Sequence, residues 1–132
     1  MTIHVPDATY LLGVAAYGDE IAVTIVTQTS YELVFYHAPL TSASTPYLVV
    51  PFFANRIPMD PAFDTAGNLW VPWVPYARPV PSGGGLLFYR APFTHYSIPE
   101  FDITTGINNP QQVVVSPPTA FQLFSTKYNF AD

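Results

Sequence analysis

The stretch LVFYHAPLT at positions 33–41 recurs as LLFYRAPFT at positions 86–94, and this repeat decides how the chain folds. The match continues without a gap to Pro46 and Pro99, so that 8 of 14 aligned residues are identical at an offset of 53. Chance would leave about one identity over such a length. Internal repeats of this period are typical of proteins built from small units that stack on one another.

A second element precedes each copy of the repeat. Residues 14–23 align with residues 62–71 at an offset of 48, and each stretch reads as an apolar strand, a turn rich in Gly, Asp and Asn, and another apolar strand. This is the pattern of a β-hairpin. Residues 113–124 fit the same hairpin at an offset of 52 from the second copy. We therefore predict one domain of repeats: a unit at 10–57, a second at 58–109 and a partial third at 110–132.

Helices are disfavoured throughout the chain. No window shows a 3.6-residue apolar period, and 15 prolines leave few uninterrupted stretches. Hydrophobic residues make up 49% of the chain, enough to build a core. The sequence predicts an all-β protein of short antiparallel strands.

The second unit carries a family resemblance. PMDPAFDTAGNLWV at 58–71 resembles the opening of a blade in an NHL-type β-propeller, LLFYRAPF at 86–93 resembles its third strand, and INNP at 107–110 resembles the lead-in to the next blade. The resemblance implies four-stranded blades around a central axis. Pro72 and Pro75 depart from it, so we expect the second strand to end near Val71 or to bulge there.

A propeller of two and a half blades would be incomplete. The alternation at residues 2–5 predicts a short strand, and residues 1–9 could complete the third blade. Two copies of the chain would then close a ring, so a homodimer is the favoured partner state. The residues expected at this contact are Ile3, Val5, Phe121, Leu123, Tyr128 and Phe130. The alternative is a β-sandwich in which two sheets cover each other.

Composition narrows the function classes. Only 10% of the residues are charged and the net charge is −5, which disfavours binding to nucleic acid or to an anionic membrane. Cysteine is absent, so a disulfide, a thiolate metal site and a cysteine nucleophile are excluded. The first residues lack the basic start and long apolar run of a signal peptide.

Catalysis finds no support in the motifs. No Gly-x-Ser-x-Gly elbow, phosphate loop or His-Glu-x-x-His occurs, and the three histidines are far apart in sequence. We therefore predict a protein that is not an enzyme and holds no cofactor or metal. Asp64, which precedes the Gly-Asn turn, is expected to cap that turn through its side chain.

Four residues are candidates for ligand binding. Trp73 and Tyr76 lie beyond the matched strand, in a proline-rich stretch where aromatic rings suit sugar stacking. His37 and Arg90 occupy the matched position after each Phe-Tyr pair and are expected to face solvent. Trp70 is expected in the core.

The sequence thus favours a non-catalytic structural or binding module that presents rigid loops, placed outside the cell or on a particle such as a virion. A carbohydrate-binding propeller that uses Trp73 and Tyr76 is one alternative. A metal-dependent hydrolase of the lactonase kind is another, although the ring of acidic ligands it needs is missing. Beyond a second copy, a glycan or another protein is a candidate partner.

Overall fold

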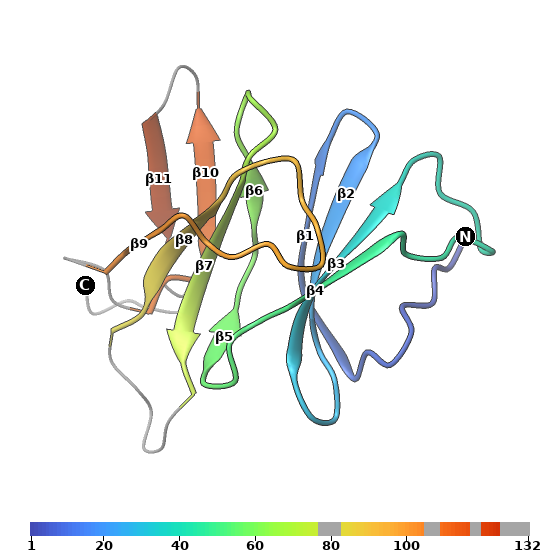
Figure 1. Ribbon diagram of the computed structural model, residues 1–132, viewed down its shortest axis with the longest axis horizontal. Helices are drawn as coiled ribbons and strands as arrows, with labels where there is room; N and C mark the ends of the chain where they lie inside the picture. Colours follow the sequence, from blue (N-terminus) through green and yellow to red (C-terminus); the bar gives the residue numbers. More distant parts are fainter. Residues whose placement is uncertain (77–82, 105–108, 117–119, 125–132) are drawn as a thin grey trace.

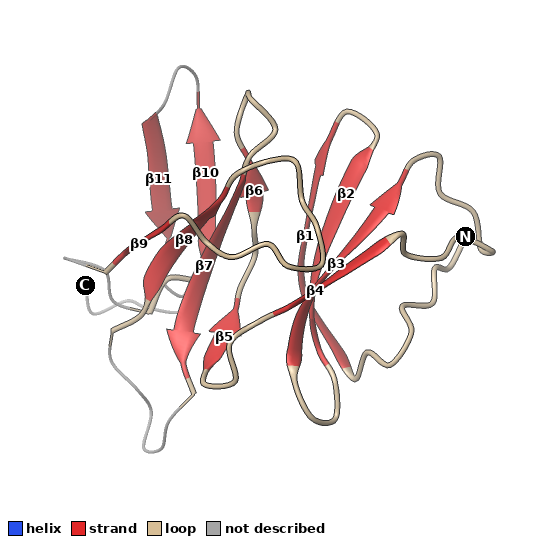
Figure 2. Ribbon diagram, viewed as in Figure 1, coloured by secondary structure: helices blue, strands red, loops and turns tan. Residues whose placement is uncertain are grey.

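The computed structural model describes residues 1–76, 83–104, 109–116 and 120–124. These residues form eleven β-strands and no helix. Figure 2 shows this all-strand architecture. All strand pairs are antiparallel. The expectation of an all-β protein with short antiparallel strands is confirmed.

The first sheet, sheet A, is a four-stranded meander in chain order. Its strands are β1 (Tyr10–Tyr17), β2 (Glu20–Val26), β3 (Tyr31–His37) and β4 (Leu48–Pro51). Tyr17 pairs with Glu20, which leaves Gly18-Asp19 as a two-residue turn with Gly18 at φ 59°. Only residues that tolerate positive φ suit the tight turns of such hairpins. The hairpin expected over residues 14–23 is confirmed.

The second sheet, sheet B, repeats this order with an interrupted first strand. It comprises β5 (Arg56–Pro58), β6 (Ala62–Phe63), β7 (Leu69–Pro75), β8 (Gly85–Tyr89) and β9 (Phe101–Ile103). Both β5 and β6 pair with β7, on either side of a gap at residues 59–61.

That gap explains why β7 continues past Val71, where we expected it to end. The Pro72 carbonyl accepts a hydrogen bond from Met59 N at 2.8 Å. An extended residue directs its N–H and C=O to the same side, so the missing N–H of Pro72 also faces the gap. The proline thus costs sheet B no regular ladder bond, and β7 runs to Pro75.

The third sheet, sheet C, is a hairpin of β10 (Gln112–Ser116) and β11 (Ala120–Phe124). It confirms the hairpin expected over residues 113–124. Figure 1 shows sheet B between sheet A and sheet C, and β10 contacts both β6 and β7.

The turns that follow β3 and β8 make the same hydrogen bonds at an offset of 53. Thr41 N donates to Ser44 Oγ at 2.8 Å, and Thr94 N donates to Ser97 Oγ at 2.7 Å. Each serine N donates in return to the threonine carbonyl at 2.9 Å. The preceding bonds Ala38–Pro39 and Ala91–Pro92 are both cis. The repeated letters therefore specify the same backbone path in both sheets.

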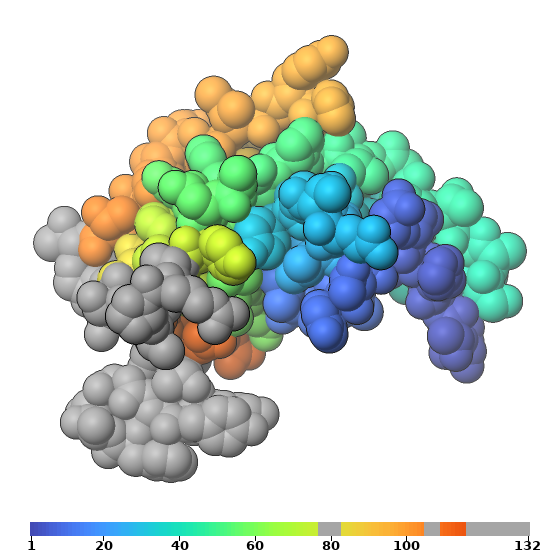
Figure 3. Space-filling model, turned by 90° about the horizontal axis from the view of Figure 1, so that it is seen from below, coloured from blue at the N-terminus to red at the C-terminus, as the bar shows by residue number. Residues whose placement is uncertain are grey.

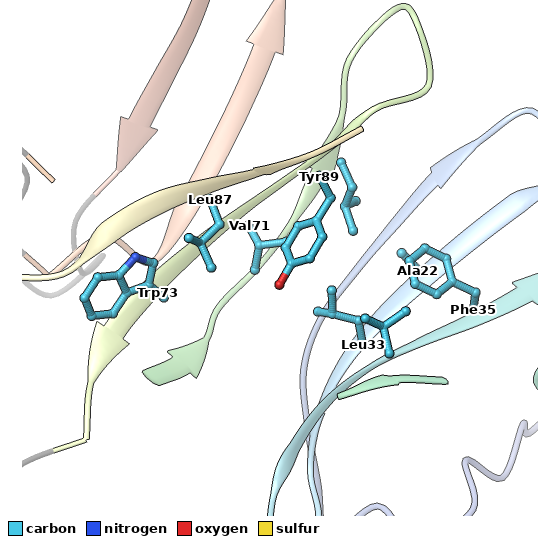
Figure 4. Close-up of a cluster of buried hydrophobic side chains, with 9 residues drawn as sticks. Ala22, Leu33, Phe35, Val71, Trp73, Leu87 and Tyr89 are labelled. Carbon is cyan, nitrogen blue, oxygen red and sulfur yellow. The ribbon is translucent and has the colours of Figure 1, made fainter. Parts of the chain in front are cut away.

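The main core lies between sheets A and B, as Figure 4 shows. Phe35 is fully buried there and stacks on Phe93 with ring centroids 4.9 Å apart. The buried members of this cluster are Ala22, Leu33, Phe35 and Val50 from sheet A, and Leu69, Val71, Trp73, Leu87 and Tyr89 from sheet B. Alternate residues of each strand supply them, as the two-residue period of a strand requires.

Asp60 lies where the first strands of the three sheets meet. Its Oδ1 accepts from Val14 N at 3.2 Å, and its backbone N donates to the Gln111 carbonyl at 3.1 Å. Gly13 makes this close approach possible, because a Cβ there would lie 2.5 Å from the Asp60 Cα.

Residues 1–9 form no strand, which differs from the strand expected over residues 2–5. Val5 is instead buried against sheet A, on the face turned away from sheet B. Apolar burial therefore places this segment across the face of the sheet, whereas alternation alone had suggested an added edge strand.

Candidate functional site

The candidate site is the face of sheet A turned away from sheet B, called here the outer face of sheet A. It carries Val23 and Ile25 from β2, and Val34 and Tyr36 from β3. These residues alternate with the ones that build the main core, so sheet A is apolar on both faces. A sheet apolar on both faces needs a cover on each.

Residues 1–9 supply only part of that cover. Val5 packs with Ile3 and Ala8 on the buried residues of this face. In Figure 3 the N-terminal segment, in dark blue, lies at one end of the molecule, beyond the lighter blue of β1. Leu11 and Val14 in β1 remain 60% and 62% exposed. The cover is therefore missing over β1.

An apolar groove occupies the uncovered part. Its volume is about 400 Å³, and its lining is Ile3, Val5, Leu11, Leu12, Gly13, Val14, Ile21, Val23, Tyr36 and Leu40. No charged side chain is in that set. The groove suits an apolar surface better than a charged ligand.

The hydroxyl of Tyr36 is the one polar side-chain group at this groove. It is buried and has no hydrogen-bond partner among the described residues. Burial raises the pKa of Tyr36 above its ordinary value, so the phenol keeps its proton. Buried hydroxyls almost always find a partner, and one left without a partner calls for an explanation.

The repeat shows what covers the same face in sheet B. In the repeat, β2 aligns with β7 at an offset of 48, and β3 aligns with β8 at an offset of 53. The residues on the outer face of sheet A align with residues on the face of sheet B that packs on sheet A. The pairs are Ile21 with Leu69, Val23 with Val71, Ile25 with Trp73, Val34 with Leu87, and Tyr36 with Tyr89. The outer face of sheet A is thus equivalent to a face that another sheet covers.

Sheet C allows the same comparison with sheet A at one position. Val14 is the register partner of Val23, and Val113 is the register partner of Leu123, which aligns with Val23 at an offset of 100. Val113 is 3% exposed, while Val14 is 62% exposed. The equivalent residue is therefore buried where a preceding sheet exists and open where none does.

Two of the residues predicted to bind a ligand lie at matching ends of sheets A and B. His37 is exposed and stacks on Tyr47 with ring centroids 3.8 Å apart, and its Nδ1 lies 4.0 Å from a Glu20 oxygen. Tyr47 donates a hydrogen bond to Glu20. Arg90 is exposed and makes a two-point ion pair with Glu100 at 2.6 and 2.8 Å. Each residue is therefore engaged with its own neighbours.

The other two lie at the opposite end of the ladder between β7 and β8. Trp73 is 9% exposed, its indole N donates to Asp102 at 3.0 Å, and the Arg56 guanidinium lies 4.3 Å from its ring centroid. Tyr76 is exposed, and its ring lies 6.5 Å from that of Tyr31. The four candidates do not form one site, and Trp73 is a core residue of β7.

Of the residues expected at a contact between copies, Ile3 and Val5 lie on the outer face of sheet A. Phe121 and Leu123 lie in β11, opposite Val115 and Val113 in the ladder of sheet C. Tyr128 and Phe130 lie outside the described residues.

A second concavity, of about 480 Å³, lies where the turns of sheets A and B meet. Tyr17, Glu20, Tyr47 and Phe93 are among its lining residues. The Tyr17 hydroxyl donates to the Thr65 carbonyl at 3.0 Å and so joins the two sheets. Sequence reasoning missed this cleft, because Tyr47 aligns with Glu100 and nothing in the repeat marks the pair as functional.

In the described part of the chain, no three His, Asp or Glu side chains gather where they could hold a metal ion. Among those same residues, no helix has the length and apolarity to cross a membrane. The chain was compared with protein-family models, curated proteins and solved structures, and none of them matches it.

Proposed function

We propose that this chain is a non-catalytic structural module that associates with a second copy of itself. The observation that carries the proposal is the outer face of sheet A, which is apolar, partly open and equivalent to a covered face of sheet B. An uncovered apolar sheet face of this kind is typical of an interface. We further propose that the sheets follow one another as blades of a β-propeller, with three sheets from each copy.

The mass in solution tests this proposal. Light scattering behind a sizing column, over a range of concentrations, should give a discrete species of about twice 14.6 kDa. A chain that stays a compact monomer at high concentration would contradict self-association and favour a self-contained β-sandwich.

A second candidate function is carbohydrate binding at the cleft between the turns of sheets A and B. Tyr17 and Tyr47 are both partly exposed there, beside the carboxylate of Glu20. Aromatic rings next to carboxylates suit neutral sugars, whose C–H faces stack and whose hydroxyls donate hydrogen bonds. Calorimetric titration with neutral mono- and disaccharides, repeated on Tyr47→Ala, tests it. Heat that is equal for both proteins would contradict binding at this cleft.

A further inference from the structure

The layer formed by sheet C covers only part of sheet B. Trp70, Phe88 and Phe101 share the face of sheet B turned away from sheet A, where the Phe88 and Phe101 rings stack with centroids 4.7 Å apart. Sheet C has two strands in the described residues, and its first strand contacts β6 and β7 at the start of sheet B. Phe101, in the last strand, stays 42% exposed. In the described part of the chain, this layer therefore has no strand over β9, the last strand of sheet B.

The outer face of sheet A shows the reverse pattern. Val5 shares a buried cluster with residues of β2 and β3, and Val49 of β4 packs against that cluster, while Leu11 and Val14 of β1 stay 60% and 62% exposed, so residues 1–9 cover sheet A beyond β1. The groove remains on the side of β1 and β2. On this face, the part of the cover over β1, the first strand of sheet A, is therefore missing.

The N-terminal segment also carries unused hydrogen-bonding capacity. Residues 2–4 make no backbone hydrogen bond to any described residue. An extended stretch with free N–H and C=O groups can pair with the edge of a sheet. In sheet C, β11 pairs only with β10 among the described strands. Its other edge carries no strand from the described part of the chain.

Resting on the self-association proposed above, we infer that the third layer is built from two copies of the chain. Sheet C of one copy fills the groove on sheet A of the second copy, and residues 1–9 of the second copy lie over Phe101 of the first. The contact is head-to-tail: the last sheet of one copy meets the first sheet of the other. The same contact forms twice, once between sheet C of the first copy and sheet A of the second, and once between sheet C of the second copy and sheet A of the first. Together the two contacts close a ring of six sheets, three from each chain.

Two exposed valines give the contact a direct test. Val14 lies at the groove, and Val114 is exposed on β10, where its neighbour Val113 is buried. Because both are exposed, Val14→Arg and Val114→Arg should leave the fold of a single copy intact, which near-ultraviolet circular dichroism checks. Each variant alone should be monomeric, because each loses one partner surface at both contacts of the ring. Ile98→Arg, at a residue 79% exposed in the connection before β9, is the matched control and should remain a dimer.

Mixing the two variants distinguishes the arrangements. A Val114→Arg copy keeps its sheet A face, and a Val14→Arg copy keeps its sheet C face, so one contact survives and a one-to-one species of twice the chain mass returns. If Val114→Arg alone remains a dimer, the two sheet A faces meet each other, and the head-to-tail inference is wrong while self-association stands. A monomeric wild-type chain would instead overturn the proposed function.

Cross-linking tests the position of residues 1–9. The chain has no cysteine, so Ile3→Cys and Phe101→Cys each carry a single thiol. Figure 1 places the N-terminus and β9 at opposite ends of one copy. Oxidation of the mixture should therefore give a disulfide-linked heterodimer in excess of that from Ile3→Cys with Tyr76→Cys. Equal yields in a mixture that still dimerises would show that residues 1–9 do not cover Phe101 of the other copy.

Discussion

Asp60 and Asp64 flank β6, and their surroundings shift their pKa values in opposite directions. Burial raises the pKa of Asp60, and the single bond from Val14 N offsets this only in part. Burial also acts on Asp64, but bonds from Trp70, Asn68 and Ala66 outweigh it and lower its pKa. Asp64 caps the turn before β7, as expected from the sequence, with bonds of 2.9 Å from Ala66 N and Asn68 N.

Asp64→Asn should destabilise the chain by about 1–3 kcal/mol at neutral pH, because the amide cannot accept all four donors that the carboxylate accepts. A lowered pKa contributes stability above the unfolded pKa, and that stability is lost as the pH falls through the folded pKa. Urea unfolding at several pH values should show the difference shrinking in acid. A difference that is constant with pH would contradict this role of the charge.

Asp60→Asn should leave the free energy of unfolding at neutral pH unchanged or higher. The amide oxygen can still accept from Val14 N, while the partly buried charge is removed. Because the pKa of Asp60 is raised in the folded state, the free energy of unfolding of the wild type should fall as the pH rises through that pKa. The variant has no carboxyl at this position, so its free energy of unfolding should not show this fall. Parallel thermal scans of the two proteins from acid to neutral pH measure it. Asp60→Ala, which removes the acceptor, is the control and should cost about 1 kcal/mol.

Tyr36→Phe separates stability from association. In the dilute monomer the change removes a buried hydroxyl that has no hydrogen-bond partner among the described residues. The free energy of unfolding should therefore stay the same or rise by up to about 1 kcal/mol. If the second copy supplies the missing partner, the dimer Kd should rise by up to about tenfold. Sedimentation equilibrium measures it, with Tyr96→Phe, at an exposed tyrosine, as the control. An unchanged Kd would show that the hydroxyl gains no partner on association.

At the scale of the elements, stability rests on the packing of sheet A against sheet B. Phe35 is fully buried in this core. Its ring stacks on that of Phe93, which comes from the turn after β8. Phe35→Ala should lower the free energy of unfolding by about 3–5 kcal/mol, as deletion of a buried aromatic ring does. Phe53→Ala, at a more exposed ring, should cost far less in the same denaturant titration. Similar losses for both would place the main core elsewhere.

The elements were largely predictable from local signals, and the exceptions have physical causes. The repeat, the hairpins and the Asp64 cap depend on a few neighbouring residues, so the sequence predicted them. The continuation of β7 through Pro72 depends on a gap in β5 and β6, which only pairing reveals. Trp73 was expected at a binding surface, because nothing near it in sequence shows that Asp102 and Arg56 enclose it. The candidate site itself arises from which face lacks a neighbour, and alternation alone carries no such information.

At the scale of the whole molecule, the charge-poor surface sets how association should respond to salt. With 10% charged residues and no charged side chain lining the groove, the contact should draw little from ion pairs. Raising sodium chloride from about 50 to 500 mM should therefore leave the dimer Kd unchanged or lower it, since each copy carries a net charge of −5. Sulfate should tighten it further. A dimer that dissociates as sodium chloride rises would indicate an electrostatic contact.

Residues of sheet A recur on sheet B at offsets of 48 and 53, and in the proposed propeller one rotation would carry each sheet onto the next. That rotation is set inside a single chain, by the packing of Phe35, Leu87 and their neighbours. In the proposed ring a second copy would follow the same rotation. Whether a growing series of sheets returns to its start or winds on as a helical filament is then a matter of angle, and a few degrees of change in one buried contact would turn a closed particle into a fibre.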